Sequence, residues 1–377
     1  MKIAYLGIKG LPSKWGADRV VEALVNNLSA QDKLTVYCSA RHVVETIPQL
    51  PNLNFIRIKP FGGKRFQMVW VDFFSALHAI FQGDYDIIHL HNIEASFILP
   101  LLRIKYPVIS TSHGRMTSGN RWGKISTLLI QLMEIPFVWI SNIATSVSKI
   151  DSSDLSKKYH RQVRYIPNGV DENPEVDILK AKRLLLEKGL KDKKFILFSA
   201  GRLIPLKGVH ILLEAFNAIN TDKKLVIIGD FSSSIEYYEQ LKTLADNRVV
   251  FVPFVSSSAT LFGIIKLSEL FVFPSLQEAM SMTLLEATSL GVPIICSDIP
   301  QNKAVLEDCG YYFHSGDSED LKEKIEWALQ NTIAMKAQAK VAQDHVIKHF
   351  SWREIVKMYE LIYIEALTRQ RRNTFRT

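Results

Sequence analysis

Two glutamates, Glu278 and Glu286, stand with seven residues between them in the sequence EAMSMTLLE. The apolar run directly before this segment is typical of a buried strand. Ser281 can cap a helix that ends just before Gly291. This pattern predicts that Glu278 lies in the loop after the strand, and that Glu286 lies in the first turns of the helix.

The chemistry open to such a pair depends on its neighbours. A carboxylate accepts hydrogen bonds from two vicinal hydroxyl groups, so one glutamate could hold a ribose and the other a hexose. Phosphate oxygens bind well to amides at a helix start, here those of Met282, Thr283 and Leu284. Paired carboxylates can also act as the acid and the nucleophile of a glycosidase. The basic residues nearby favour a phosphorylated substrate instead.

Two cations, Arg202 and Lys207, follow another strand-like run in the sequence SAGRLIPLKG, and Gly208 precedes the helix that comes next. Cations beside a helix N-terminus make a strong site for a diphosphate. The alternative is a pair of solvated side chains. The position after a strand favours the diphosphate site.

The first half of the chain offers two further candidates at strand ends. Gly7, Gly10 and Gly16 permit a tight turn after the first strand, and Asp18 could start the helix behind it. Their spacing differs from the compact dinucleotide-binding pattern. His113 ends a later strand in the sequence TSHG, where an imidazole can reach a ligand or bond locally within its loop.

The sequence HLHN places His89 and His91 on one face of a strand. Two histidines without a third ligand nearby make a poor metal site. We therefore expect His91 to be a packing residue or to support another side chain.

These candidates require parallel strands whose carboxyl ends meet. Continuous Val/Ile-rich runs alternate with helical patterns in two series, separated by a break near residues 167–190. This predicts the α/β class, with two doubly wound Rossmann-like domains facing a cleft. We expect a first domain over 1–168 and a second over 169–351. A long amphipathic helix, about 352–377, can pack back on the first domain.

The composition fits a globular protein of two domains, with 47% hydrophobic and 22% charged residues. The three cysteines have no metal-ligand spacing and fit a reducing compartment. The first residues, MKIAYLGIKGLP, predict a strand and not a secretory signal. The most apolar window, 128–147, is interrupted by polar residues, so we expect a buried or interfacial helix there.

The chain resembles a known family in these same segments. GRLIPLKG, EAMSMTLLE and the preceding IPNGVD are similar to motifs of the retaining GT-B glycosyltransferases of the family-4 type. WGADRVV and TSHG resemble the N-terminal motifs of that family. Three segments, GIKGLPSKWG, SHGRMTSGNRWGK and SDIPQNKAVLEDCGYYFHSGD, are similar to bacterial transferases of polysaccharide assembly, including rhamnosyltransferases.

The resemblance implies a division of labour among the candidates. Arg202 and Lys207 would bind the donor diphosphate and stabilise the leaving nucleotide in place of a metal, so no cofactor is expected. Glu286 would hold the ribose and Glu278 would face the donor sugar. His113 would contact that sugar near the reacting carbon. The implied reaction retains the anomeric configuration, and the leaving phosphate oxygen takes the acceptor's proton.

Three positions depart from the family pattern, and the first of them adjoins Gly16. Gly16 would let its backbone approach the diphosphate, but Trp15 stands where the family commonly has another glycine. Asp18 replaces a glutamate. Ser281 stands where many members have glycine, which a capping role would tolerate.

The acceptor is expected on the first domain, where segments 61–70 and 113–124 mix basic and aromatic residues. That mixture suits the headgroups of an anionic membrane. It predicts a peripheral protein on the inner, cytoplasmic face of the membrane, with a lipid-diphosphate-linked saccharide as acceptor. The basic residues expected at this surface are Lys64, Arg65, Arg115, Arg121 and Lys124.

The resulting hypothesis is a transferase that uses a UDP- or dTDP-sugar in capsule, O-antigen or exopolysaccharide assembly. A sugar-nucleotide epimerase or a phosphorylase on the same fold is an alternative enzyme. The net charge of +8 also allows a non-enzymatic protein that binds polyanions. No nucleic-acid-binding motif is present, so nucleic acid is not an expected partner.

Overall fold

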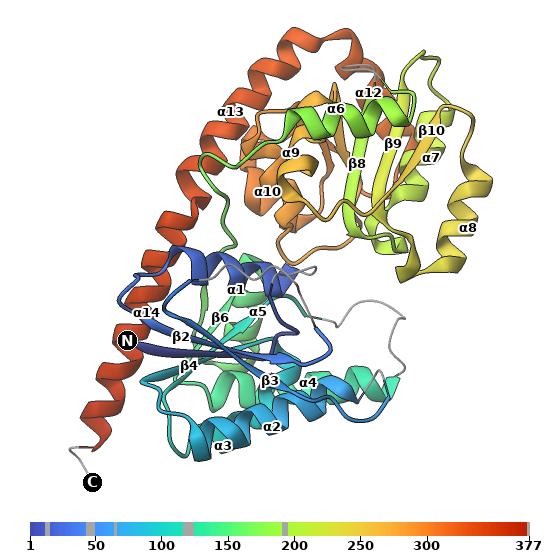
Figure 1. Ribbon diagram of the computed structural model, residues 1–377. Helices are drawn as coiled ribbons and strands as arrows, with labels where there is room; N and C mark the ends of the chain where they lie inside the picture. The colour runs from blue at the N-terminus through green and yellow to red at the C-terminus, as the bar shows by residue number, and fades with distance from the viewer. Residues whose placement is uncertain (12–15, 43–49, 64–65, 116–123, 191–194, 375–377) are drawn as a thin grey trace. The chain divides into compact units, whose positions relative to one another are not determined.

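The computed structural model describes the chain except for residues 12–15, 43–49, 64–65, 116–123, 191–194 and 375–377. The chain forms two compact units (Figure 1). Unit 1 comprises Met1–Asn168 together with Trp352–Thr377, and unit 2 comprises Gly169–Ser351.

Unit 1 is built on a parallel sheet with the strand order β3-β2-β1-β4-β5-β6-β7, as far as the chain is described. Its strands are mostly buried, because helices cover a parallel sheet on both faces. The strands are β1 (Lys2–Leu6), β2 (Lys33–Ser39), β3 (Leu53–Ile58), β4 (Ile87–His91), β5 (Val108–Ser112), β6 (Ile143–Ser146) and β7 (Val163–Tyr165).

The helices of unit 1 include the last one of the chain, which returns to this unit and contacts β4 and β5. Its Tyr359 and Tyr363 are fully buried there. The helices are α1 (Gly16–Asn27), α2 (Gln67–Gln82), the 3₁₀ turn η1 (Ile93–Ile98), α3 (Leu99–Leu102), α4 (Lys124–Trp139), α5 (Lys149–Tyr159) and α14 (Trp352–Thr374).

The expected helix over 128–147 is only partly correct. The helix α4 ends at Trp139, and β6 begins at Ile143 within the same apolar window. Apolar side chains serve both a helix that lies on a sheet and a buried strand, so hydropathy alone does not separate the two elements.

Unit 2 repeats the architecture with the order β10-β9-β8-β11-β12-β13 in the described residues. Its strands are β8 (Phe195–Arg202), β9 (Lys224–Asp230), β10 (Val249–Pro253), β11 (Leu270–Phe273), β12 (Ile294–Ser297) and β13 (Tyr312–Phe313). The order reverses between the neighbours β8 and β11. In open parallel sheets, ligands bind outside the carboxyl ends of the strands at such a point.

The helices of unit 2 cover this sheet and enclose an apolar core that includes Phe198, Phe216 and Val272. They are α6 (Ile178–Glu187), η2 (Pro205–Lys207), α7 (Val209–Asn217), η3 (Phe231–Ser233), α8 (Ile235–Leu244), α9 (Ser258–Leu267), α10 (Met282–Ser289), α11 (Pro300–Leu306), η4 (Glu307–Cys309), α12 (Ser318–Gln330) and α13 (Thr332–Phe350).

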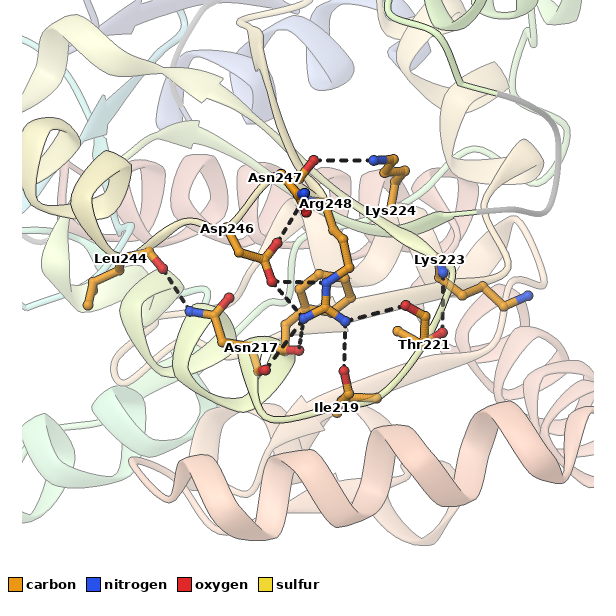
Figure 2. Close-up of polar contacts among 10 residues, drawn as sticks. Asn217, Ile219, Thr221, Lys223, Lys224, Leu244, Asp246, Asn247 and Arg248 are labelled. Carbon is orange, nitrogen blue, oxygen red and sulfur yellow. Dashed lines mark hydrogen bonds and ion pairs between the residues drawn. The ribbon is translucent and has the colours of Figure 1, made fainter.

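The C-terminal end of α7 is held by one arginine, Arg248, at the edge of β10 (Figure 2). Its guanidinium donates to the carbonyl oxygens of Phe216 at 3.1 Å and Ile219 at 2.6 Å, and it lies 4.6 Å from the Phe216 ring. The Asp246 carboxylate accepts from the same group at 2.6 Å. A cation here satisfies carbonyls that a helix end leaves unpaired. Arg248 therefore fixes α7, whose other end lies beside Lys207.

Candidate functional site

The loops after β8 and β11 touch through their backbones. Gly208 has φ +67°, and a Cβ atom at this position would lie 1.9 Å from the carbonyl oxygen of Pro274. The amide of Leu276 donates to the carbonyl oxygen of Leu206 at 2.9 Å. Gly208 is therefore required both by its left-handed conformation and by this close approach.

An ion pair joins the same two loops. The Nζ atom of Lys207 lies 2.6 Å from Oε1 of Glu278, and the side chains are 21% and 10% exposed. A pair this far from water is stable only while both partners are present. The structure thus brings together two predicted site residues, at the edge of the sheet where a ligand is expected.

The helix that follows Glu278 begins as the sequence indicates. Ser281 is the N-cap of α10, and its hydroxyl accepts from the amide of Leu284 at 3.2 Å. The cap engages the Leu284 amide, and the part of this amide in a phosphate site stays a prediction. In the first turn, the amides of Met282 and Thr283 have no partner within the helix and remain the candidates.

The other two residues of the predicted donor site lie on the same elements. Glu286 is inside α10 and only 7% exposed. Arg202 is the last residue of β8, where it is exposed and pairs in register with Asp230 of β9. Both positions agree with the expected placement after a strand or within the first turns of the helix.

In unit 1, His113 directly follows β5 and meets the last residue of β4. Its Nε2 atom lies 2.8 Å from Nδ1 of His91, and the two rings stack with centroids 5.1 Å apart. His91 is fully buried. Burial lowers the pKa of His113 to about 4, so this imidazole is neutral at pH 7. We infer that His91 orients His113 through this hydrogen bond.

A second buried histidine links this pair to the C-terminal helix. Nδ1 of His89 lies 2.8 Å from the hydroxyl of Tyr363 on α14, and Nε2 lies 2.7 Å from the hydroxyl of Thr111. Burial lowers the pKa of His89 to about 3. The sequence shows HLHN but gives no sign that a tyrosine far along the chain completes the network.

The turn after β1 differs from expectation at Asp18. The helix α1 begins at Gly16, so Asp18 lies inside it and does not start it. The carboxylate is 3% exposed and accepts from the amide of Lys9 at 3.1 Å. Burial raises its pKa to about 6. A Cβ atom at Gly16 would meet no atom of the described residues within 4 Å.

Of the basic residues expected at the membrane, Arg115 has a different role. Its guanidinium donates to Glu134 at 3.0 Å, and the two side chains are only 17% and 1% exposed. Arg115 thus neutralises a buried carboxylate, and a role for it at a membrane surface stays a prediction. Lys64, Arg65 and Arg121 lie outside the described residues. Lys124 begins α4, but its side chain is outside the described part.

The described residues contain no group of three or more His, Cys, Asp and Glu side chains that could hold a metal ion. No described helix has the length and the apolar character needed to cross a membrane.

Two family models match the chain, one in each half. Residues 16–173 match the model described as Glycosyltransferase Family 4, and residues 182–345 match the model described as Glycosyl transferases group 1. The second match contains Arg202, Lys207, Glu278 and Glu286. The first contains Gly16 and His113.

Two curated proteins illustrate the similarity in sequence. The phosphatidyl-myo-inositol mannosyltransferase of Mycobacterium leprae is 25% identical over 78% of this chain and 79% of that protein. The UDP-Gal:alpha-D-GlcNAc-diphosphoundecaprenol alpha-1,3-galactosyltransferase of Escherichia coli is 27% identical over 59% of this chain and 60% of that protein. Both relatives are named as enzymes of glycosyl transfer.

The fold agrees with solved structures. The Anabaena protein HepE in complex with UDP and glucose matches with a TM-score of 0.81, covering 97% of this chain and all of that chain, at 17% sequence identity. The two parallel-sheet units, the two matched domains and these relatives lead to one conclusion. This chain is a glycosyltransferase with the GT-B fold, composed of a family 4 domain and a group 1 domain.

Proposed function

We propose that this chain transfers a sugar from a UDP- or dTDP-sugar to a lipid-diphosphate-linked saccharide, with retention of configuration. The observation that carries the donor half of this proposal is the Lys207–Glu278 ion pair at 2.6 Å. It lies where the carboxyl ends of β8 and β11 meet, at the start of α10. A cation, a carboxylate and helix amides together suit a molecule that contains both a diphosphate and a sugar.

The donor would bind by exchanging partners with this ion pair. The oxygens of a diphosphate carry more negative charge than one carboxylate, so they compete with Glu278 for Lys207. Glu278 would then accept hydrogen bonds from hydroxyl groups of the donor sugar. The amides of Met282 and Thr283 would bind phosphate oxygens at the helix start. Glu286 would accept hydrogen bonds from the ribose.

The leaving nucleotide diphosphate needs its developing charge stabilised. Arg202 and Lys207 would supply two positive charges there, so the proposed reaction does not depend on a metal ion. The bond between the anomeric carbon and the phosphate oxygen breaks, and the acceptor oxygen bonds to the same face of that carbon. The acceptor's proton passes to the leaving phosphate oxygen. No other proton carrier is then required.

His113 would act as a neutral hydrogen-bonding group in this reaction. Its lowered pKa of about 4 keeps it uncharged at neutral pH. It can therefore orient a sugar hydroxyl without bringing a positive charge near the reacting carbon, where positive charge develops in the transition state. The hydrogen bond between His91 and His113 would limit the orientations available to His113.

The names of relatives support the proposed classes of donor and acceptor. HepE was solved with UDP and glucose, and the Escherichia coli relative is named for a UDP-sugar donor and a diphosphoundecaprenol-linked acceptor. We place the reaction in capsule, O-antigen or exopolysaccharide assembly, at the cytoplasmic face of the membrane. The narrower proposal of a rhamnosyl donor rests on the resemblance of the segments 7–16, 112–124 and 297–317.

A transfer assay tests this proposal. The enzyme is supplied with UDP-, dTDP- or GDP-sugars and a lipid-diphosphate-linked saccharide, with a chelator present. We expect release of one nucleotide to depend on the acceptor, and the anomeric proton of the product to show retention by NMR. An inverted product, a strict need for a divalent metal ion, or turnover of none of these donors would contradict it.

A further inference from the structure

The helices α2, α3 and α4 lie on one face of the sheet of unit 1 (Figure 1). On α4, an outward stripe runs along the helix through side chains spaced by four, three and four residues. Leu128 is 57% exposed, Leu132 46%, Ile135 47% and Trp139 54%. This spacing places all four on one side of an α-helix.

The helix α2 has a similar outer side. Val69, Phe73 and Phe81 are exposed, and Phe66 just before the helix is 55% exposed. Trp70 contributes to this surface by packing against Phe61, with ring centroids 5.0 Å apart. Large aromatic side chains are thus left facing outward with no protein layer described above them.

Neither helix exposes an acidic or basic side chain, as far as their side chains are described. Asp72 of α2 is 6% exposed, and burial with the nearby Glu94 raises its pKa to about 8. Glu134 of α4 is 1% exposed and is neutralised by Arg115 and Lys158. A helix in contact with water normally carries charges on its outer side. Among the side chains that the structure describes, these two helices carry charges only on the inner side.

Cations lie at the C-terminal ends of both helices. Lys105 donates to the carbonyl oxygens of Ile80 at 2.8 Å and Gly83 at 2.9 Å, at the end of α2. Arg161 bonds the carbonyl oxygen of Trp139 and lies 5.6 Å from the Trp139 ring, at the end of α4. The turns η1 and α3 contact both helices and connect the two sides. Apolar and aromatic groups bordered by cations match the boundary between acyl chains and anionic headgroups.

We propose that the outer sides of α2 and α4 form one lipid-inserting surface, which lies flat in the headgroup region of a bilayer that contains anionic lipid. This inference rests on the proposed function, since a lipid-linked acceptor must be reached at a membrane. It differs from the expectation based on basic loops, because apolar insertion and not charge supplies most of the binding. Binding should therefore survive high salt, where attraction between exposed charges is screened.

One end of this surface lies at the same edge of the sheet as His113. In a parallel α/β sheet, a helix that follows a strand starts at the carboxyl edge of the sheet and runs back. The helix α4 follows β5 and His113 in the chain, so its N-terminal end belongs to the same edge as His113. A saccharide on a lipid held by this surface would enter the unit near that edge.

Flotation with vesicles tests the inference on the full-length chain. Wild type is mixed with vesicles of phosphatidylcholine and phosphatidylglycerol at low and high salt. The variant L132S/I135S interrupts the stripe on α4. The matched control is L361S/I364S, because Leu361 and Ile364 are 67% and 55% exposed on α14 of the same unit. UDP, dTDP and GDP binding is measured in parallel for all three proteins.

We expect wild type and the control to float at both salt concentrations, and L132S/I135S to bind at least about tenfold more weakly. Equal binding of that variant, or loss of wild-type binding in high salt, would overturn the inference. So would a wild-type dimer that L132S/I135S converts to a monomer, since a second copy would then cover this face. Lipid binding without nucleotide binding would contradict the proposed function but support the lipid-inserting surface.

Misfolding of the double variant would not end the test. Wild-type tryptophan fluorescence is followed with vesicles whose acyl chains carry a bromine quencher. We expect quenching, and W139F should lose part of it. The absence of any quenching in wild type would contradict insertion.

Discussion

Units 1 and 2 share a parallel-sheet architecture but differ in the polarity of their central strands and of some of their surface helices. The surface helices of unit 2 carry ion pairs such as Lys242–Glu239 and Lys340–Asp344, both at 2.7 Å. The central strands of its sheet are mainly apolar inside. Unit 1 instead buries polar side chains in its central strands and leaves apolar side chains on α2 and α4. The buried polar set includes His89, His91, Thr111, Thr145 and Ser110.

This contrast separates what a shared fold requires from what each unit does. An apolar interior with polar groups only at the strand ends suffices to hold a soluble donor, as proposed for unit 2. Packing alone does not require the buried histidine network of unit 1, because apolar residues would fill the same space without the cost of burying polar groups. We interpret it as support for His113. The apolar exterior is interpreted as a membrane surface.

The largest effect is expected at the polar strand ends of unit 2. Changing Glu278 to Gln should lower kcat/KM by about 10³-fold, because an amide cannot neutralise Lys207 or accept as strongly from sugar hydroxyls. The matched control is Glu269→Gln. Glu269 pairs with Lys223 at the opposite edge of the same sheet, with side chains 19% and 17% exposed.

This control should lose stability but keep kcat/KM. Equal losses of activity in the two variants would contradict the claim that the donor binds at the carboxyl edge of the sheet and not at the opposite edge. Glu286→Gln adds a second comparison, since it should weaken nucleotide binding more than it slows transfer.

The second effect concerns the carboxyl group buried under α2. The pKa of Asp72 is raised from an ordinary value to about 8, so the folded state holds a proton that the unfolded chain releases. Stability should therefore fall as pH rises from about 4 to about 8. Asp72→Asn should remove this loss and stabilise the protein at pH 9 by up to about 6 kcal/mol, the full value of a shift of this size. Urea denaturation at pH 5 and pH 9 measures it, with Asp84→Asn as the exposed control. If the free energy of unfolding changes equally between pH 5 and pH 9 in wild type and in Asp72→Asn, Asp72 is ionised in the folded state.

A smaller loss of stability is expected at Arg248 (Figure 2). Arg248→Lys keeps the charge but cannot reach Asp246 and the carbonyls at the end of α7 together, so unit 2 should lose about 2 kcal/mol. Nucleotide binding below the unfolding transition should stay unchanged, because Arg248 lies at the far end of α7 from Lys207. A loss of nucleotide affinity in the folded variant would contradict this, because it would mean that Arg248 affects the nucleotide site through α7.

The smallest effect should be the response of the rate to pH through His113. With a pKa lowered to about 4, this group stays neutral between pH 8 and pH 6, and protonation of His113 should not change kcat in that range. The stability contribution has the opposite sign to that of Asp72. The unfolded histidine takes up a proton near its ordinary pKa, so stability falls as pH drops below about 6.5.

Histidine ring signals in NMR spectra can check this prediction. His113→Gln identifies the His113 resonance. A ring that titrates near pH 6.5 would contradict the lowered pKa of His113, and a kcat that falls with that same titration would make His113 an ionising catalytic group.

The sequence predicts the features of the fold that depend on local pattern. Continuous apolar runs mark strands such as β8 and β9, and Ser281 with Gly291 marks the bounds of α10 closely. The helix α13 was not anticipated. Its buried side includes Ala339 and Ala342, and such small side chains produce little apolar periodicity.

The candidate site was predictable residue by residue but not as an assembly. The cap, the strand end and the two glutamates are set by neighbouring residues. The Lys207–Glu278 pair spans 71 positions and exists because β8 and β11 are neighbours in the sheet. The Tyr363–His89 contact spans 274 positions and depends on where α14 returns. Local patterns do not contain the strand order or the return of a helix.

Calorimetric titration of UDP, dTDP and GDP, without added metal, tests the central claim that the donor binds at the carboxyl edge of the sheet in unit 2. Wild type is compared with Lys207→Ala and with Lys223→Ala, which breaks the ion pair at the opposite edge. The account predicts that wild type and Lys223→Ala bind one of these nucleotides alike, and that Lys207→Ala binds it at least about tenfold more weakly. Equal affinity in Lys207→Ala and wild type would contradict it.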